Sequence, residues 1–343
     1  MKKLCDGMIT EKYPAKINAY LANLMDSSEA IQKQFSPSHL ELITTGSTSP
    51  WDNNESSNII GLESISHSKA VIMPTINCFA YCRHCIRKER VRKERAQMSS
   101  KDIAKVVEVI KENNSVRDVL ITGGDPFIVP EILTELLHYL SKLSQIKNIR
   151  IGTRITTVNP NSLSLELLRT ISQYSKFGQF IELSVQYNHP DELTDQSSSA
   201  LERTHSSGLR VYNQTVLLKG INDNANILYT LFSELIGKGV DQLYIYHCAP
   251  ISGVHHFRTT VEKGMEIKRD LTKLGLTGRA IPKYVLVTDV GKLEYLIDCE
   301  TVKKEDNYLY LRTTYTKSEL KSIPKNSYID NRDFLVIKYL DGE

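Results

Sequence analysis

The sequence predicts an α/β fold: an open (β/α)6 partial barrel, preceded by an N-terminal helical extension and followed by a C-terminal β-rich cap. From about residue 70, short runs rich in β-branched residues alternate with segments of helical periodicity, which is typical of parallel βα units. The last five of six candidate strands begin at residues 118, 148, 180, 210 and 242. An interval of about 30 residues suits one strand and one crossover helix. Six such units predict an open barrel rather than a closed barrel of about eight strands.

The predicted strands are Val71–Ile76, Asp118–Thr122, Asn148–Gly152, Phe180–Val185, Arg210–Leu218 and Gln242–Cys248. Helices are predicted between them, at Lys101–Asn113, Glu131–Leu143, Asn224–Gly239 and Thr260–Gly275. In the first helix, Ile103, Val106 and Ile110 recur at the spacing of one helical face. The last two helical segments end in glycine, as helices often do.

The two flanks of the barrel are built differently. Near the N-terminus, two helices are predicted at Glu11–Met25 and Ser27–Phe35, and a polar loop follows at 44–58. Near the C-terminus, the segments KLEYLID, NYLYLRTTYT and DFLVIKYL are typical of short strands. We therefore expect three parts: a helical extension over 1–65, the barrel over 66–288 and the cap over 289–343.

Composition narrows the class of protein. Apolar residues make up 41% of the chain and charged residues 24%, as in ordinary globular proteins. A net charge of +3 does not favour nucleic acid or a membrane as a partner. The segment MKKLCDGMITEKYP lacks the apolar core of a signal peptide, and no stretch approaches the roughly 18 apolar residues of a membrane span. We expect a soluble cytoplasmic protein.

Three of the six cysteines gather in the segment CFAYCRHC, as Cys78, Cys82 and Cys85. The segment follows the first predicted strand, so it forms a loop at the carboxyl end of the sheet, where α/β proteins bind ligands. Three thiolates can bind three irons of a [4Fe–4S] cluster and leave the fourth iron open to a small molecule. A structural zinc site that adds His84 is the alternative, although adjacent Cys85 and His84 make poor co-ligands.

The spacing Cys-x3-Cys-x2-Cys after the first strand resembles the signature of the radical S-adenosylmethionine (SAM) superfamily. The resemblance implies that the open iron binds SAM and that reductive cleavage yields a 5′-deoxyadenosyl radical. The second strand ends in LITGGDPF, which is a turn signal by itself but is similar to the superfamily's Gly-Gly-Glu/Asp-Pro stretch. This similarity implies that Gly123, Gly124 and Asp125 contact SAM. Gln214 is a further implied SAM contact, and His84 is included as a cofactor-binding candidate.

Several phrases in the same order resemble lysine 2,3-aminomutase and its relatives over roughly residues 60 to 295. They are YCRHCIRKE, VRDVLITGGDPF, IRIGTR, YNHPDELT, NQTVLLKGIND, YIYHC and HFRTTVEKGMEI. The resemblance implies a 2,3-amino shift that uses pyridoxal phosphate. It also implies that Arg87 clamps the substrate carboxylate, which a guanidinium can do through two parallel hydrogen bonds. The alternative places Arg87 on the solvated face of a basic helix that runs from Arg83 to Arg95.

The sequence departs from this family where the cofactor lysine and a substrate ammonium would be bound. Lys292 is the candidate anchor for pyridoxal phosphate, but only Gly291 stands where the family has a run of glycines, and a surface lysine on a hairpin is the alternative. The two aspartates that would bind a lysine ammonium correspond to Ala249 and to Val287, or to Asp289 if the gap is moved. Because a buried ammonium without its carboxylate is costly, free lysine is not the expected substrate.

We therefore expect a radical SAM enzyme that abstracts hydrogen from an amino acid or related small molecule anchored by Arg87. With pyridoxal phosphate on Lys292 the reaction is an amino shift, an isomerase activity. Without it, the outcome is dehydrogenation, epimerisation, decarboxylation or another rearrangement. A macromolecular substrate, such as RNA or a protein lysine, and a zinc-stabilised module that binds nucleic acid through the basic helix are the remaining alternatives. The resemblance also implies a reducing partner, such as flavodoxin or ferredoxin, and a homo-oligomer.

Overall fold

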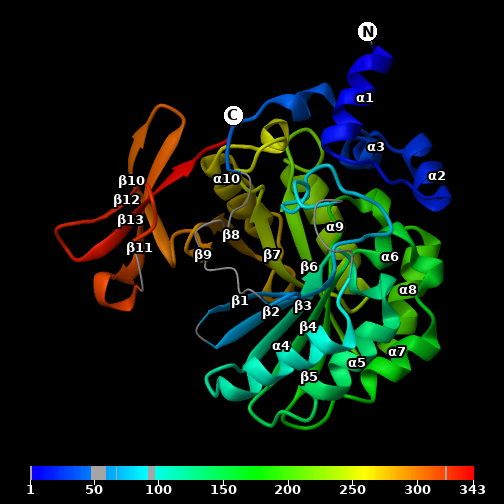
Figure 1. The fold of residues 1–343 in the computed structure, drawn as a ribbon. Helices are drawn as coiled ribbons and strands as arrows, with labels where there is room; N and C mark the ends of the chain where they lie inside the picture. The colour runs from blue at the N-terminus through cyan, green and yellow to red at the C-terminus, as the bar shows by residue number, and fades with distance from the viewer. Residues whose placement is uncertain (1, 48–58, 67, 92–96, 321–322) are drawn as a thin grey trace.

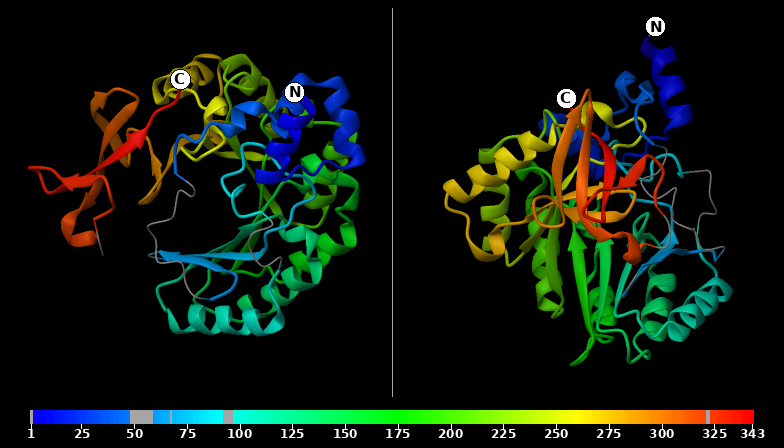
Figure 2. Two further views of the ribbon diagram at one scale, coloured as in Figure 1. Left: turned by 45° about the horizontal axis from the view of Figure 1, so that its top comes forward. Right: turned by 90° about the vertical axis from the view of Figure 1, so that its left-hand side faces the viewer.

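The computed structural model describes residues 2–47, 59–66, 68–91, 97–320 and 323–343. Its main sheet contains nine strands in chain order. They are β1 (Leu62–Ser66), β2 (Lys69–Thr75), β3 (Asp118–Gly123), β4 (Asn148–Thr153), β5 (Phe180–Val185), β6 (Arg210–Leu217), β7 (Asp241–His247), β8 (Lys283–Thr288) and β9 (Gly291–Glu294). Strands β2 to β8 are parallel, and β1 and β9 are antiparallel edges. The sheet curls with helices along its outer side (Figures 1 and 2), so the predicted partial barrel is confirmed.

All six predicted strands are present, as β2 to β7. The prediction omitted β8, a seventh parallel strand. Its residues after Lys283 are all buried, with no alternation between buried and exposed positions. Such a strand lacks the period of two on which strand prediction relies. The KLEYLID segment, expected in the cap, instead contributes β9, which pairs with β8 in the main sheet.

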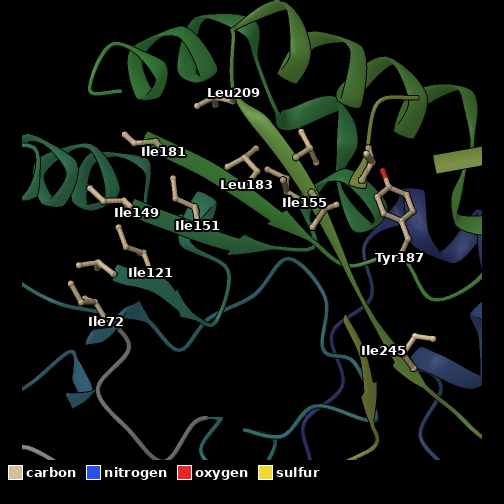
Figure 3. Close-up of a cluster of buried hydrophobic side chains, with 14 of the residues drawn as sticks. Ile72, Ile121, Ile149, Ile151, Ile155, Ile181, Leu183, Tyr187, Leu209 and Ile245 are labelled. Atoms are coloured by element: carbon tan, nitrogen blue, oxygen red, sulfur yellow. The ribbon is translucent and has the colours of Figure 1, made fainter. Parts of the chain in front are cut away.

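The helices of the barrel are α4 (Ser100–Glu112), α5 (Pro130–Leu140), α6 (Ile155–Val158), α7 (Leu165–Ser172), α8 (Asp195–Ser206), α9 (Ala225–Gly237) and α10 (Val261–Lys273). The four predicted helices are therefore confirmed. A core of apolar side chains lies between sheet and helices, including Ile72, Ile121, Ile149 and Leu183 (Figure 3). Because strand residues alternate between faces, the remaining side chains of these strands point to the concave side.

The N-terminal extension contains α1 (Lys2–Lys12), α2 (Ala19–Ser27) and α3 (Glu29–Phe35). The single helix predicted at Glu11–Met25 is wrong, because the chain leaves the helical path between α1 and α2. Pro14 lies in this break, and the Asn18 side chain caps the new helix by accepting from the Leu21 amide at 2.8 Å. The predicted polar loop at 44–58 lies mostly outside the described residues.

The cap is a separate antiparallel sheet in the order β10-β11-β13-β12. Its strands are β10 (Cys299–Glu305), β11 (Tyr308–Thr316), β12 (Ser327–Ile329) and β13 (Phe334–Leu340). It lies beside the barrel (Figure 1). The buried side chain of Arg258 connects the two, because its guanidinium donates to the carbonyl oxygens of Leu340 and Asp341 at 2.6 and 2.8 Å. No helix within the described ranges has both the length and the apolar character needed to cross a membrane.

Candidate active site

The cysteine loop follows β2 and forms a pocket at the carboxyl end of the sheet. Cys78, Cys82 and Cys85 line this pocket together with Arg87 and Gly123. The structure therefore brings together the predicted cluster ligands, the predicted carboxylate clamp and one glycine of the GGD motif. Lys292 and Gln214 are not part of this pocket's lining.

The predicted basic helix is not formed over residues 83–91, which make a series of turns. Arg83 and Lys88 are buried there, and both contact the fully buried carboxylate of Glu41 in η1 (His39–Leu42). The prediction of a continuous solvated basic helix is therefore wrong for residues 83–91. The hypothesis of a nucleic-acid-binding module loses its main support, because it depended on that helix. The rest of the predicted basic helix, residues 92–96, lies outside the described residues.

A buried ionic network holds the cysteine loop from both sides. Arg83 Nε donates to Glu41 at 2.9 Å, and Lys88 Nζ donates to the same carboxylate at 2.8 Å. Arg83 also donates to the carbonyl oxygen of Pro14 at 2.9 Å, and Lys88 donates to that of Gly253 at 2.8 Å. Burial raises the pKa of Glu41, but the hydrogen bond with Arg83 and the charges of Lys88 and Arg83 outweigh it and lower the pKa below its ordinary value. Sequence reasoning missed Glu41, because its partners lie about 40 residues away along the chain.

The three thiols fit the binding of a cluster by their chemistry. Burial raises the pKa of Cys78 well above its ordinary value, and the charges of Asp125 and the other two cysteines add to this. Burial also raises the pKa of Cys85. Iron binds the thiolate form, so a bound cluster would offset this rise in pKa. Within the described residues, no three Cys, His, Asp or Glu side chains form a group that could hold one metal ion.

The two glycines of the GGD motif bring β3 against the start of the cysteine loop. A Cβ atom on Gly124 would lie 2.1 Å from the carbonyl oxygen of Asn77, which leaves no room for any other residue. Gly123 has φ of 116°, a region that L-residues rarely adopt. The amide of Asp125 donates to the same Asn77 oxygen at 2.8 Å. Gly124 thus allows a close approach between two parts of the chain itself, directly before Cys78, and SAM contacts of the glycines stay a prediction.

The carboxylate of Asp125 is buried and joins β3 to the end of β4. It accepts hydrogen bonds from the Thr153 hydroxyl at 2.8 Å and from the amides of Arg154 and Phe127 at 3.0 and 3.1 Å. Burial raises the pKa of this carboxyl group, and those hydrogen bonds act in the opposite direction. The side chain thus has a structural role, and its predicted contact with SAM stays a prediction.

Arg154, at the end of β4, is a site residue that sequence reasoning missed. Its NH1 group donates to Cys82 Sγ at 3.0 Å. Its NH2 group donates to Gln34 Oε1 and Glu192 Oε1, at 3.1 Å each. Arg154 is the last residue of the IRIGTR segment, but the sequence of that segment does not show that the guanidinium contacts a cysteine.

His84 is buried next to the cysteines but faces the loop after β5. Its Nε2 atom lies 3.2 Å from Gln186 Nε2 and 3.5 Å from Asn188 Nδ2. Burial, followed by the charges of Arg154 and Lys88, lowers the pKa of His84 well below its ordinary value, so the ring is neutral and can accept from these amides. The described residues do not combine His84 and the thiols into a site for one metal ion. The zinc alternative therefore lacks support, and a contact with a bound cofactor stays a prediction.

Lys292 lies on β9 and reaches towards β7. Its Nζ atom donates to the Tyr246 hydroxyl at 2.5 Å, and that hydroxyl donates to Gln214 Oε1 at 2.9 Å. The residue is exposed, although its amine lies over the ring of Tyr246, 4.5 Å from the ring centroid. Burial, followed by the charges of Lys69 and Arg150, lowers the pKa of Lys292 to about 7. Lys292 is therefore an exposed hairpin lysine whose amine contacts Tyr246 of β7, and its role as a cofactor anchor stays a prediction.

Arg87 is 11% exposed and lines the cysteine pocket. Its Nε atom lies 4.0 Å from Glu63 Oε1. The Glu63 carboxylate is bound more closely by Arg90, whose NH1 group donates to it at 2.7 Å. Arg87 thus contributes a largely buried positive charge to the pocket lining, and its contact with a substrate carboxylate stays a prediction.

Comparison with known proteins places similar sequences beside this chain. A model described as the Radical SAM superfamily matches residues 72–228. The chain is 36% identical to the L-lysine 2,3-aminomutase of Methanococcus maripaludis over 282 residues, which cover 80% of this chain and 64% of that protein. It is 33% identical to a putative L-lysine 2,3-aminomutase of Aquifex aeolicus over 313 residues, 89% of this chain and 83% of that one. It is 30% identical to the glutamate 2,3-aminomutase of Clostridioides difficile over 304 residues, 87% and 71% of the two chains.

These similarities define the class first: the chain belongs to the radical SAM superfamily of enzymes, whose members use a [4Fe–4S] cluster and SAM. Within that class it belongs to the lysine 2,3-aminomutase family. It spans somewhat less than two thirds of the Methanococcus protein. Among solved structures, it is similar to Streptococcus suis SuiB bound to the precursor peptide SuiA, with a TM-score of 0.47 and 16% identity over 66% of this chain and 49% of that one.

Proposed function

We propose that this chain is an aminomutase that holds a [4Fe–4S] cluster on Cys78, Cys82 and Cys85, cleaves SAM reductively, and moves an amino group between neighbouring carbons of an amino acid. Pyridoxal phosphate bound to Lys292 would supply the imine chemistry that such a migration requires. The observation that carries this proposal is the position of Lys292, whose amine faces Tyr246 on the barrel strand β7.

The surroundings of Lys292 favour a reactive amine. Formation of an imine requires the neutral form of a lysine, and a pKa of about 7 makes that form abundant at neutral pH. Tyr246 holds the amine in place through its hydroxyl, which Gln214 orients from the other side. Tyr246 therefore acts as a positioning residue for the lysine.

Excess positive charge near Lys292 supports an anionic cofactor. The amine feels the charges of Lys69, Arg150 and Arg87, and the charge of Asp118 acts in the opposite direction. Asp118 is already bound to Arg150 through its Nε at 3.2 Å. A phosphate group beside Lys69 and Arg150 would offset this repulsion, which is a favourable arrangement for pyridoxal phosphate.

The substrate is expected to carry a carboxylate and an uncharged side chain. Arg87 supplies the cation for the carboxylate, next to the cysteine pocket. Ala249 and Val287 lie in a buried apolar cluster with Cys248 and Ile251. Neither position supplies a carboxylate to a second ammonium, which argues against free lysine as the substrate; Asp289 stays the alternative partner for such an ammonium.

Two measurements test the proposal. Iron-free protein with added pyridoxal phosphate should show an absorbance band that borohydride removes, and the reduced cofactor should be found on the peptide that contains Lys292. Lys292→Ala should abolish the band, whereas Lys283→Ala, which removes an exposed lysine bound to Glu294, should keep it. Reconstituted enzyme given deuterated amino acids should then place deuterium in 5′-deoxyadenosine.

If wild-type protein shows no such absorbance band but still transfers deuterium to 5′-deoxyadenosine, the proposed amino shift is contradicted. It would support the second candidate, a radical reaction without pyridoxal phosphate, which is favoured by the tight β8–β9 hairpin with its single Gly291. The cleavage of SAM also needs an external electron, so we propose a reducing partner such as flavodoxin or ferredoxin. A homo-oligomer and a cytoplasmic location stay predictions.

A further inference from the structure

Arg154 links three parts of the site. It follows β4 directly, and its backbone amide donates to the buried Asp125 carboxylate of the GGD motif at 3.0 Å. Its guanidinium is buried and lies over the ring of Phe35 in α3, 5.0 Å from the ring centroid. The backbone and the planar group are thus both fixed, so the direction of its N–H groups is set by the fold.

The guanidinium is directed at one particular cysteine. Arg154 NH1 lies 3.0 Å from Cys82 Sγ. Among the hydrogen bonds of the described residues, this is the one that a charged side chain donates to a sulfur of the cysteine loop. The other hydrogen bond to these sulfurs comes from the backbone amide of Arg87, which lies 3.4 Å from Cys85 Sγ.

The same guanidinium is balanced by a buried carboxylate. NH2 donates to Glu192 Oε1 at 3.1 Å, and the other oxygen of Glu192 accepts from the Asn188 amide at 3.0 Å. Gln34 contacts both groups: its Oε1 accepts from Arg154 at 3.1 Å and its Nε2 donates to Glu192 at 2.8 Å. Glu192 is 1% exposed, so solvent does little to screen this pair.

We propose that Arg154 and Glu192 set the reduction potential of the cluster through Cys82, with Arg154 as the residue that raises it and Glu192 as the one that limits the rise. A cluster gains one negative charge on reduction. An N–H donor and a positive charge next to a cluster thiolate therefore stabilise the reduced form, and a neighbouring carboxylate opposes this. Both are positioning residues, since they act through Cys82. This inference rests on the proposed binding of a cluster by the three cysteines.

The test is a redox titration of the reconstituted protein, followed by the EPR signal of the reduced cluster. Arg154→Met should lower the ratio of reduced to oxidised cluster at a fixed solution potential at least tenfold, which corresponds to about 59 mV for one electron. Glu192→Gln removes the opposing charge and should shift the potential in the positive direction. Arg203→Met is the matched control, because Arg203 is a half-buried arginine that donates to the carbonyl oxygens of Leu163 and Pro160, and it should leave the potential unchanged.

Iron and sulfide are counted in every variant before titration. Wild-type iron content with unchanged potentials in Arg154→Met and Glu192→Gln would overturn the inference while leaving the proposed function intact. A shift of both variants in the same direction would also overturn it. If Arg154→Met fails to assemble a cluster, Glu192→Gln alone decides by the sign of its shift. Absence of iron from the wild-type protein would refute the proposed function itself.

Discussion

The cysteine loop and the Lys292 hairpin are held in very different ways. Two buried cations, Arg83 and Lys88, hold the loop on Glu41, and Gly124 packs against its first residues. Lys292 lies on a four-residue edge strand, and its amine has one hydrogen bond, to Tyr246, among the described residues. The loop with the proposed cluster cysteines is thus held by a buried ionic network. The lysine proposed to select the reaction lies on an edge strand of the sheet.

The largest expected effect is the loss of folding stability on removal of Glu41. This change would remove the buried ionic network that distinguishes the cysteine loop from the Lys292 hairpin. Glu41→Ala leaves Arg83 and Lys88 buried without their carboxylate, which typically costs about 3–5 kcal/mol. Chemical unfolding of wild type and variant at neutral pH measures the loss. Glu29→Ala removes an exposed carboxylate paired with Lys33, and the account predicts no comparable loss there.

The same variant has a defined pH dependence. Since folding lowers the pKa of Glu41 below its ordinary value of 4.5, its stabilisation is present above that value and disappears as the pH falls through the lowered pKa. The difference in unfolding free energy between wild type and Glu41→Ala should therefore be largest at neutral pH and narrow in acid. A difference that grows in acid would show that the carboxylate is not held in its charged form.

The second-largest expected effect is a loss of bound iron in Gly124→Ala. The added methyl would lie 2.1 Å from the Asn77 oxygen, so the backbone before Cys78 must move. We expect a folded protein that binds less iron, measured as iron per chain after reconstitution. Gly237→Ala is the control, because nothing lies within 4 Å of a Cβ at that helical position, and its iron content should match the wild type. Equal iron in both variants would mean that this contact does not position the cysteines.

Most of the barrel and the cysteine pocket could be predicted from the sequence. The strands β2 to β7 show regular spacing, and the three candidate cluster cysteines are close together in the chain, so local patterns were enough. The sequence did not show β8, because a strand buried on both faces has no alternation. It also did not show Glu41 or Arg154. Their roles depend on contacts across 42 and 72 residues, respectively, which no local spacing encodes.

The smallest effect concerns the amine of Lys292. With a pKa of about 7, its neutral fraction rises as the pH increases through 7, whereas an ordinary lysine requires a pH near 10.5. Trapping of pyridoxal phosphate by borohydride at Lys292 should therefore rise severalfold between pH 6 and 8, then level off. Tyr246→Phe should shift this curve modestly without removing it. A trapping curve that keeps rising towards pH 10 would indicate an ordinary, solvated lysine and would contradict the lowered pKa of Lys292.

The most direct test of the central claim is the reductive cleavage of SAM by anaerobically reconstituted protein. The account predicts several irons and sulfides per chain and the formation of 5′-deoxyadenosine on addition of a reductant. Cys82→Ala should lose both iron and product, whereas Cys299→Ala, which changes a buried cysteine in the cap, should retain both. Wild-type protein with only trace iron, or a Cys82→Ala variant that still forms 5′-deoxyadenosine, would contradict the account.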